Sequence, residues 1–451
     1  MHIRRRIKYS KIHFVHRLLK NTTWIMLGQI FQMILSFFIG LWAVRYLGPS
    51  DFGSLTYISS YIALFTAACT MGLDTVVVNR LVRFKQRDGE IVTSAILIRS
   101  IAAFISMGAL AIVVGFADHG DQKLLWIAML SGFELLFKAA GTISCWYQYK
   151  LLSKKTALAD MAAFTIASMY RLWLLISSKN IYWFAFYNSF IYLMIAVFYI
   201  PMFKKDVDHA GKPTGEMCKD LLRGSFPYLI SAILVSLYTQ IDQIMIKQIL
   251  QSTQQVGYYA TALTLTWLIA FVPNSISVSA RPVLMDLKNK GAQDYEKRVT
   301  QVLASIVWIS FLCAFLFMVF AHPLIRLLYG ASYAPAAPVL QILVWSAIAE
   351  NMTKIRDIWL IGAQHSKFVT LLSTCGTIVN ILLNALLIPL VGIIGAAMAT
   401  VATQFAVTVF VPLLFKQTRR FGLDVMDAFT LRNIGGRELY EEICTALRGK
   451  K

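Results

Sequence analysis

Charged side chains interrupt several of the longest apolar stretches of this sequence, and their types indicate the chemistry they could do. Cations in such surroundings suit an anionic ligand, whereas isolated carboxylates suit a proton or a sodium ion. A charge removed from water is costly, so each group should face either a polar cavity or a partner. The groups are Asp74, Arg99, Glu134, Lys138, Asp160, Arg171, Asp242, Glu350, Lys354, Arg356 and Asp357.

Two clusters among these charges have the spacing of helical ion pairs. Glu134 and Lys138 are one helical turn apart, and Glu350, Lys354 and Asp357 share one stripe of a helix. Ion pairing within the protein and contact with a substrate are equal alternatives for both clusters.

Motifs for catalysis or metal binding are absent from the sequence. It has no phosphate-binding GxxxxGK[ST] segment, its 6 cysteines are isolated, and its 7 histidines form no cluster with metal-ligand spacing. Asp206-Val207-Asp208 looks like the metal-binding pair of nucleotide-sugar transferases, but a hydrated loop is the favoured interpretation because no folded domain surrounds it. We therefore expect no enzyme activity, no cofactor and no metal site.

The elements that must position these charges are membrane-spanning helices. Hydrophobic residues make up 57% of the 451 residues and charged residues only 15%, which excludes a soluble enzyme. Long apolar stretches must be helical because lipid offers no partner to backbone polar groups. We expect an all-α polytopic membrane protein whose twelve transmembrane helices lie at 22–44, 53–78, 91–117, 124–147, 156–177, 180–203, 224–247, 254–280, 299–321, 336–361, 367–388 and 392–415.

The distribution of Lys and Arg predicts the orientation of the chain. Most of the 43 basic residues fall in alternate loops and in both terminal segments, which places the N- and C-termini in the cytoplasm. This topology also explains the net charge of +20, so nucleic acid is not an expected partner. The predicted organisation is a basic cytoplasmic leader 1–20, an N-lobe 21–203, a cytoplasmic linker 204–223, a C-lobe 224–415 and a cytoplasmic tail 416–451.

An internal repeat relates the two halves. Phe52-Gly53 aligns with Val256-Gly257, and Asn21 aligns with Ser225, so the first two spans superimpose on the seventh and eighth. The later spans match in the same order and direction. The chain therefore reads as two parallel-related six-helix lobes, the architecture of a two-lobed transporter whose site lies at the lobe interface.

Five segments in this order and topology resemble a known family, the O-antigen-type polysaccharide repeat-unit flippases of the multidrug/oligosaccharidyl-lipid/polysaccharide exporter superfamily. No single segment is diagnostic, but together they cover residues 20 to about 415. The segments are Arg45-Tyr46-Leu47-Gly48-Pro49-Ser50-Asp51-Phe52-Gly53, Gly72-Leu73-Asp74, Tyr238-Thr239-Gln240-Ile241-Asp242 before Val256-Gly257-Tyr258-Tyr259, Leu327-Leu328-Tyr329-Gly330, and Pro389-Leu390-Val391-Gly392-Ile393-Ile394-Gly395-Ala396-Ala397.

The resemblance implies a bacterial inner-membrane flippase. Such a protein moves an undecaprenyl-pyrophosphate-linked oligosaccharide, as in lipopolysaccharide biosynthesis, from the cytoplasmic to the outer leaflet by alternating access. Expected partners are this lipid-linked substrate, membrane lipids, a coupling proton or sodium ion, and other polysaccharide assembly proteins; a monomer suffices. The alternatives are a proton- or sodium-coupled multidrug antiporter of the same superfamily and, less favoured, an interaction scaffold.

Candidate site residues follow from charge, depth and helical stripe. Arg99 and Lys138 lie where no lipid headgroup is in reach, whereas Arg80 and Arg281 end their spans and could instead anchor to lipid phosphate. The candidate substrate-binding cations are Arg80, Arg99, Lys138, Arg171, Arg281 and Lys354. The coupling or gating candidates are Asp74, Asp242 and Glu350, with Asp242 expected to be protonated in at least one transport state. The predicted polar stripe of the cavity is Gln29, Gln32, Ser236, Thr239 and Asn274.

The topology can be tested by cysteine labelling of intact cells. Cysteines placed at Gly120 and Ser252 should react with an impermeant reagent from outside, because both lie in poorly charged loops opposite the termini. A cysteine at Lys212 should not react. Labelling of position 212 from outside would contradict the twelve-span arrangement.

Overall fold

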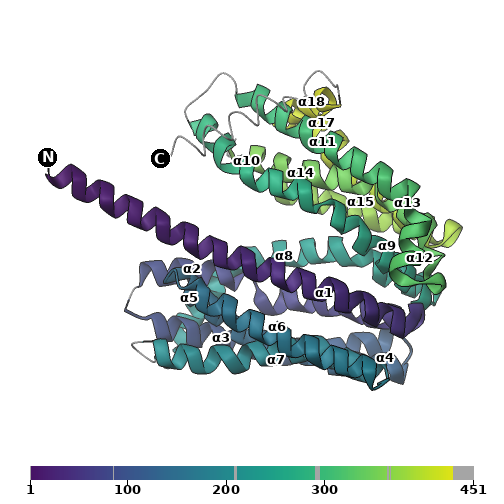
Figure 1. Ribbon diagram of the computed structural model, residues 1–451, viewed down its shortest axis with the longest axis horizontal. Coiled ribbons are helices and arrows are strands. Elements are labelled where there is room, and N and C mark those ends of the chain that lie inside the picture. The colour runs from purple at the N-terminus through teal and green to yellow at the C-terminus, as the bar shows by residue number, and fades with distance from the viewer. Residues whose placement is uncertain are drawn as a thin grey trace. The chain divides into compact units, whose positions relative to one another are not determined.

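The chain folds into two compact units, Met1–Ser236 (unit 1) and Leu237–Lys451 (unit 2), each built from helices (Figure 1). The computed structural model describes residues 2–84, 86–207, 211–289, 295–362, 365 and 367–429, and the regular elements of these residues are all helical. The boundary falls inside one helix, α8. The predicted lobes 21–203 and 224–415 stay a prediction.

Unit 1 contains seven α-helices, one 3₁₀ segment and the first part of α8. The elements are α1 (His2–Thr70), α2 (Leu73–Arg83), α3 (Asp88–Ala117), α4 (Gln122–Phe137), η1 (Lys138–Thr142), α5 (Ile143–Tyr149), α6 (Ser153–Ile176), α7 (Ile181–Asp206) and α8 (Gly215–Leu250). The 3₁₀ segment η1 lies between α4 and α5, inside a stretch that the sequence predicts to be a single span. Such mid-helix tightening often marks a hinge or local strain.

Glycines set the breaks in the first helical stretch. α1 is interrupted at Gly48, whose φ of 70° and ψ of 171° are non-helical, and Pro49 follows it. α2 begins after Gly72, which has a φ of 64°. A Cβ atom at Gly72 would lie 2.3 Å from the Cβ of Tyr228 on α8. Glycine at position 72 therefore allows both the left-handed backbone and the close approach of α8.

The core of unit 1 forms where α4 packs on α7, α1 on α6, and α6 on α7. One cluster of fully buried side chains joins α2, α3, α5 and α7, with Leu81, Ile91, Trp146 and Tyr199 among its members. Trp146 stacks edge-on against Tyr147 and Phe203, with ring centroids 4.9 and 5.5 Å apart. This packing fixes the helices that carry the charged side chains described below.

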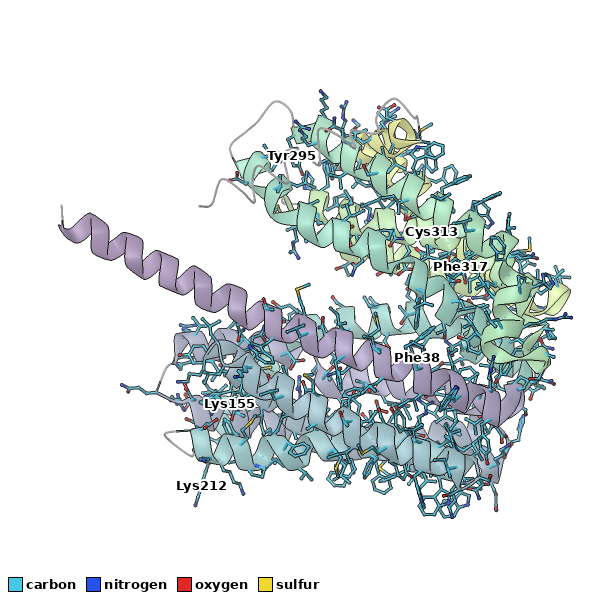
Figure 2. The ribbon with its side chains drawn as sticks, in the orientation of Figure 1. Phe38, Lys155, Lys212, Tyr295, Cys313 and Phe317 are labelled. Carbon is cyan, nitrogen blue, oxygen red and sulfur yellow. The ribbon has the colours of Figure 1, made fainter. Side chains whose placement is uncertain are left out.

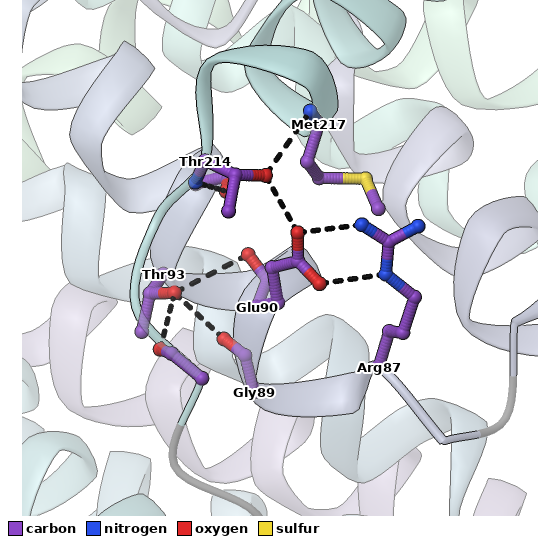
Figure 3. A network of polar contacts seen from close by, with 8 residues as sticks. Arg87, Gly89, Glu90, Thr93, Thr214 and Met217 are labelled. Carbon is purple, nitrogen blue, oxygen red and sulfur yellow. Dashed lines mark hydrogen bonds and ion pairs between the residues drawn. The ribbon is translucent and has the colours of Figure 1, made fainter.

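A polar network holds the segment between α7 and α8 against the start of α3 (Figure 3). Thr214 is the residue before α8; its hydroxyl accepts from the backbone N–H of Met217 and donates to Glu90 at 2.6 Å. Glu90 also receives two hydrogen bonds from Arg87, at 2.6 and 2.7 Å. Thr93 donates to the carbonyl of residue 211 at 2.9 Å. The described part of this connection that precedes α8 is thus held to the start of α3 at residues 211 and 214.

Unit 2 contains the rest of α8 and twelve further helical segments among its described residues. These are α9 (Thr253–Ile269), α10 (Phe271–Asn289), α11 (Tyr295–Val319), α12 (Ala321–Tyr329), η2 (Ala331–Tyr333), α13 (Ala336–Leu343), α14 (Ser346–Gly362), α15 (Lys367–Val391), α16 (Ile393–Phe405), the π-helical η3 (Ala406–Phe410), α17 (Val411–Leu414) and α18 (Arg419–Ala428). α11 packs on α14 and α18, α9 on α13, and α15 on α16. One cluster of buried side chains joins α11, α14 and α18, with Leu303, Met352 and Phe421 among its members.

Nine helical stretches of the described residues are long and apolar enough to cross a membrane. The predicted spans 22–44 and 53–78 fall in one of them, Thr23–Arg83, which bends at Gly48. The predicted spans 254–280 and 336–361 are each divided into shorter helices, α9 with α10 and α13 with α14. The first of these divisions lies next to Pro273, where the sequence predicts a kink. The all-helical membrane class is confirmed, whereas the count of twelve and the orientation of the termini stay predictions.

Basic residues that the charge distribution assigns to one side of the membrane lie together in unit 1. Lys155 at the start of α6 and Lys212 before α8 are at the same end of this unit (Figure 2). Lys155 donates to Asp206 at the end of α7, which also accepts from Tyr147 at 2.7 Å. Asp206 therefore makes structural contacts at this helix end. Asp208, its neighbour in the DxD-like segment, lies outside the described residues.

Candidate transport site

Arg99 on α3 is held by side chains of α2 and η1. Its Nη2 donates to Oδ1 of Asp74 at 2.8 Å, and its Nη1 donates to the hydroxyl of Thr142 at 2.8 Å. The thiol of Cys145 donates to the same Asp74 oxygen at 3.2 Å. The side chain of Arg99 is 5% exposed and that of Asp74 is 59% exposed. The charge of Arg99 is thus balanced inside unit 1, while Asp74 keeps an accessible face.

Lys138 stands at the junction of α4 and η1 and pairs with Glu134. This is the four-residue pairing that the sequence spacing favours. The Nζ atom also donates to the hydroxyl of Thr66 on α1 at 3.3 Å and lies 4.7 Å from the ring centroid of Tyr192. The contact with Thr66 ties α1 to the pair. Glu134 is 9% exposed, so Lys138 neutralises an otherwise buried carboxylate.

A polar cavity of about 190 Å³ lies between α1 and α6. Gln29 and Gln32, both in the predicted polar stripe, line it together with Thr156 and Asp160. Asp160 accepts a hydrogen bond from Tyr199 at 2.7 Å. The glutamines of the predicted stripe therefore do face a cavity that lies within one unit.

The other predicted cations have different surroundings. Arg80 on α2 pairs with Asp220 on α8 at 2.6 Å, whereas Arg281 on α10 is exposed. Arg171 on α6 places its guanidinium carbon 4.5 Å from the ring centroid of Tyr187.

Asp242 on α8 is the centre of a hydrogen-bond network in unit 2. Its Oδ2 accepts from the hydroxyls of Tyr259 on α9 at 2.6 Å and Thr400 on α16 at 2.7 Å. Its Oδ1 accepts from the amide of Asn384 on α15 at 2.6 Å, and the same amide donates to Asn380 at 3.0 Å. Asp242 is 8% exposed. Three donors from three helices thus converge on one buried carboxyl, and all of them belong to unit 2, as Asp242 does.

The predicted charged stripe on α14 is divided between two sets of contacts. Lys354 donates to Asn351 at 3.3 Å, and Asp357 pairs with Arg356 at 2.9 Å. Arg356 is 2% exposed and also donates to the carbonyl of Val407, in the π-helical turn of η3, at 3.1 Å. Glu350 is half-buried. The stripe therefore serves at least in part to hold α14 against η3.

The remaining residues of the predicted polar stripe are spread over α8 and α10. Ser236 is half-buried, and Thr239 and Asn274 are exposed. The predicted roles of all the candidate cations, carboxylates and stripe residues in substrate binding or coupling stay predictions.

The partners of Asp242 were not anticipated from the sequence. Tyr259 lies 17 residues away along the chain, and Asn384 and Thr400 lie 142 and 158 residues away. One signal was available: Asn380 and Asn384 are one helical turn apart in a stretch without charges, which places two amides on one face of a span. The sequence pattern of one helix does not identify the carboxyl on another helix to which these amides donate.

Similarity to known proteins defines the class. The fold resembles that of membrane transporters: "Lipid II flippase MurJ, inward closed conformation" superposes with a TM-score of 0.70 at 13% identity, covering 90% of this chain and 91% of that one. An inward-facing multidrug resistance MATE family transporter superposes with a TM-score of 0.66 at 13% identity, covering 90% and 96%.

Residues 18–288 match the polysaccharide biosynthesis protein family, and residues 227–386 match the MatE family. The chain belongs to the polysaccharide biosynthesis protein family, within the multidrug/oligosaccharidyl-lipid/polysaccharide exporter superfamily. The resemblance seen in the five sequence segments is thereby confirmed.

Two archaeal relatives align with part of the chain. "Uncharacterized membrane protein MJ1068" of Methanocaldococcus jannaschii is 26% identical over 51% of this chain and 48% of its own length. "Probable low-salt glycan biosynthesis flippase Agl15" of Haloferax volcanii is 25% identical over 44% of this chain and 41% of its own length. The alignments thus span less than half the length of these relatives.

Replacing Lys138 by Met tests the pairing in unit 1. The variant leaves the buried carboxyl of Glu134 without its cation, and we expect the free energy of unfolding to fall by about 3–5 kcal/mol. The double variant Glu134→Gln/Lys138→Met should recover most of this loss, because both charges are then gone. Thermal and denaturant unfolding of the purified protein in detergent measures both effects.

The matched control is Lys123→Met, which breaks the more exposed pair with Asp51 and should cost less than about 1 kcal/mol. Equal losses in the Lys123 and Lys138 variants would contradict a structural role for the buried pair.

Proposed function

We propose that the protein moves lipid-linked oligosaccharides from the cytoplasmic to the outer leaflet of a cytoplasmic membrane. The single observation that carries the proposal is the match of residues 18–288 to the polysaccharide biosynthesis protein family. The names of the Haloferax volcanii relative and of MurJ, both flippases, support the same class of substrate. In a bacterial host the substrate would be an undecaprenyl-pyrophosphate-linked repeat unit, and the membrane the inner membrane.

The chemistry of the interior suits this task. A flippase must pass a hydrophilic glycan through the membrane while the polyprenyl tail stays in lipid. The cavity lined by Gln29, Gln32 and Asp160 puts amide and carboxyl groups among membrane-spanning helices, where glycan hydroxyls need hydrogen-bond partners. The half-buried Arg80, which pairs with Asp220, and the exposed Arg281 are candidates to hold the pyrophosphate, since guanidinium groups match phosphate oxygens. We propose alternating access between two lobes, 21–203 and 224–415, with both termini in the cytoplasm, in a monomer that works beside other polysaccharide assembly proteins.

Asp242 is the proposed site of ion coupling. The carboxyl is buried, and the hydrogen bonds that hold it come from neutral groups: Tyr259, Thr400 and Asn384. Oδ1 of Asn384 is itself buried and has no hydrogen-bond partner among the described residues. A proton or a sodium ion arriving at Asp242 would neutralise its charge, and sodium would also find this amide oxygen as a ligand. Coupling would thus use a carboxyl whose hydrogen-bond partners among the described residues are neutral.

A multidrug antiporter is the alternative function. Asp242 favours it, since a cation-coupled exporter of cationic drugs needs an intramembrane acid. The two functions differ in what the reconstituted protein moves. Proteoliposomes should translocate a fluorescent polyprenyl-pyrophosphate-linked oligosaccharide and should not accumulate ethidium against a proton or sodium gradient. Ethidium transport without oligosaccharide translocation would establish the alternative and exclude the flippase.

Asp242→Asn tests the coupling. The asparagine side chain keeps the size and an acceptor oxygen, so the protein should fold, but it can neither take up a proton nor offer a carboxylate to sodium. Transport by this variant should lose its dependence on the pH or sodium gradient, measured as initial rates in proteoliposomes over a series of both. Asp51→Asn, at an exposed ion pair, is the control and should keep the parental profile. A parental profile in Asp242→Asn would remove the coupling role.

A further inference from the structure

Arg171 faces a second cavity of unit 1, separate from the one lined by the glutamines. This cavity has a volume of about 130 Å³ and lies among α1, α4, α6 and α7. Its polar lining comes from Thr56, Ser59, Ser131, Arg171 and Asn188. Ser59 and Asn188 are exposed, so the cavity has a mouth that an incoming group could enter.

The half-buried Arg171 differs from the buried Arg99 and Arg356, since no carboxylate of the described residues forms an ion pair with it. Arg99 and Arg356 have acids at 2.8 and 2.9 Å. The described residues that line the Arg171 cavity include no Asp or Glu. Asp160, the acid on the same helix, instead accepts from Tyr199. Among the described residues that line the cavity, no acid thus offsets the charge of Arg171.

The position of the guanidinium leaves donors for a ligand. One face lies over Tyr187, at 4.5 Å from the ring centroid, and Nη1 is near Gly40 of α1, where a Cβ atom would be 3.9 Å away. The Nε atom is buried and has no hydrogen-bond partner among the described residues. A buried charged donor without an acceptor is costly, so an acceptor at Nε would be favourable.

The hydroxyl groups near Arg171 further restrict the chemical class of ligand that the cavity could bind. Thr56 donates to the carbonyl of Phe52 at 2.8 Å, and Ser131 donates to the carbonyl of Ala185 at 2.9 Å. Their protons are therefore engaged, and the donors of the lining that remain are the guanidinium, the amide of Asn188 and the hydroxyls of Ser59 and Tyr187. One cation with two neutral donors at the mouth fits a singly charged group with further polar atoms behind it, and a guanidinium edge fits a carboxylate with two parallel hydrogen bonds.

We propose that this cavity binds a carboxylate group through Arg171. The carboxylate could come from a free acid in solution or from an acidic sugar of the transported glycan, and the second source rests on the proposed function. Tyr187 holds the guanidinium plane, and Asn188 and Ser59 hydrogen-bond the atoms next to the carboxylate. The site would thus set a preference for acidic molecules that is separate from pyrophosphate recognition.

The test is the binding of three small probes to the full-length protein in detergent, measured by thermal shift and by titration calorimetry. D-glucuronate should raise the melting temperature, and D-glucose, the neutral sugar of the same shape, should not. Acetate distinguishes the sources: stabilisation equal to that by glucuronate indicates a general carboxylate site, whereas stabilisation by glucuronate alone indicates an acidic-sugar site. Either result supports the proposal. If neither glucuronate nor acetate raises the melting temperature, the proposal is overturned.

Variants assign the effect to Arg171. Arg171→Gln should weaken glucuronate binding by roughly tenfold or more, because a charge-assisted bond to the carboxylate is lost. Arg171→Lys should retain part of the affinity, since the charge remains without the two-pronged geometry. Arg326→Gln, which removes an exposed cation in unit 2, is the control. Equal affinity in Arg171→Gln and the parent would overturn the proposal.

Two further measurements keep the outcome unambiguous. If Arg171→Gln does not fold, Asn188→Ala can be used instead, because it removes a donor at the mouth and leaves the charge in place. This variant should weaken glucuronate binding and leave the melting temperature without glucuronate unchanged. Translocation of a neutral lipid-linked oligosaccharide is independent of this cavity. Failure of glucuronate binding with intact translocation would therefore refute the carboxylate site and leave the proposed function standing.

Discussion

The cost of placing a charge among membrane-spanning helices is the constraint on which the rest of this structure depends. Each unit meets it with partners of its own. In unit 1, Asp74 balances Arg99 and Lys138 balances Glu134, and both pairs lie around the short 3₁₀ segment that separates α4 from α5. In unit 2, Arg356 uses Asp357 and a carbonyl of the π-helical turn. Buried charges thus lie beside both irregular turns, and at η3 the guanidinium of Arg356 satisfies a backbone carbonyl of the turn.

Asp242 and Arg171, the groups on which the two proposals rest, depart from this pattern. Asp242 is surrounded by neutral donors, and Arg171 by an aromatic ring and neutral polar groups. A buried charge that lacks an opposite charge is poorly explained by stability, since a pair or an apolar residue would cost less. The carboxyl in unit 2 suits a cation, and the guanidinium in unit 1 suits an anion. The two proposals therefore assign ion coupling and selection of an acidic substrate to different units of the chain.

Much of the fold could be predicted from the sequence, since apolar length alone indicates membrane helices. The repeat of Phe52-Gly53 as Val256-Gly257 indicates two related halves, and the spacing of Glu134 and Lys138 predicts their pairing. The breaks inside spans could not be predicted, because Lys138–Thr142 has no proline, and its single glycine does not specify a 3₁₀ turn. Contacts between residues far apart in the sequence could not be predicted either. Asp242 and Asn384 are 142 residues apart, and only the fold brings them together.

The most direct test of this account compares a balanced charge with an unbalanced one in the same preparation. Melting temperature and the initial rate of oligosaccharide translocation would be measured for Arg356→Met and Asp242→Asn in proteoliposomes. The account predicts that loss of Arg356 lowers the melting temperature by several degrees, because Asp357 and the Val407 carbonyl lose their partner. Loss of the Asp242 charge should leave melting nearly unchanged and abolish gradient-driven translocation. The account would be contradicted if Asp242→Asn lowered the melting temperature but kept gradient-driven translocation, while Arg356→Met left the melting temperature unchanged.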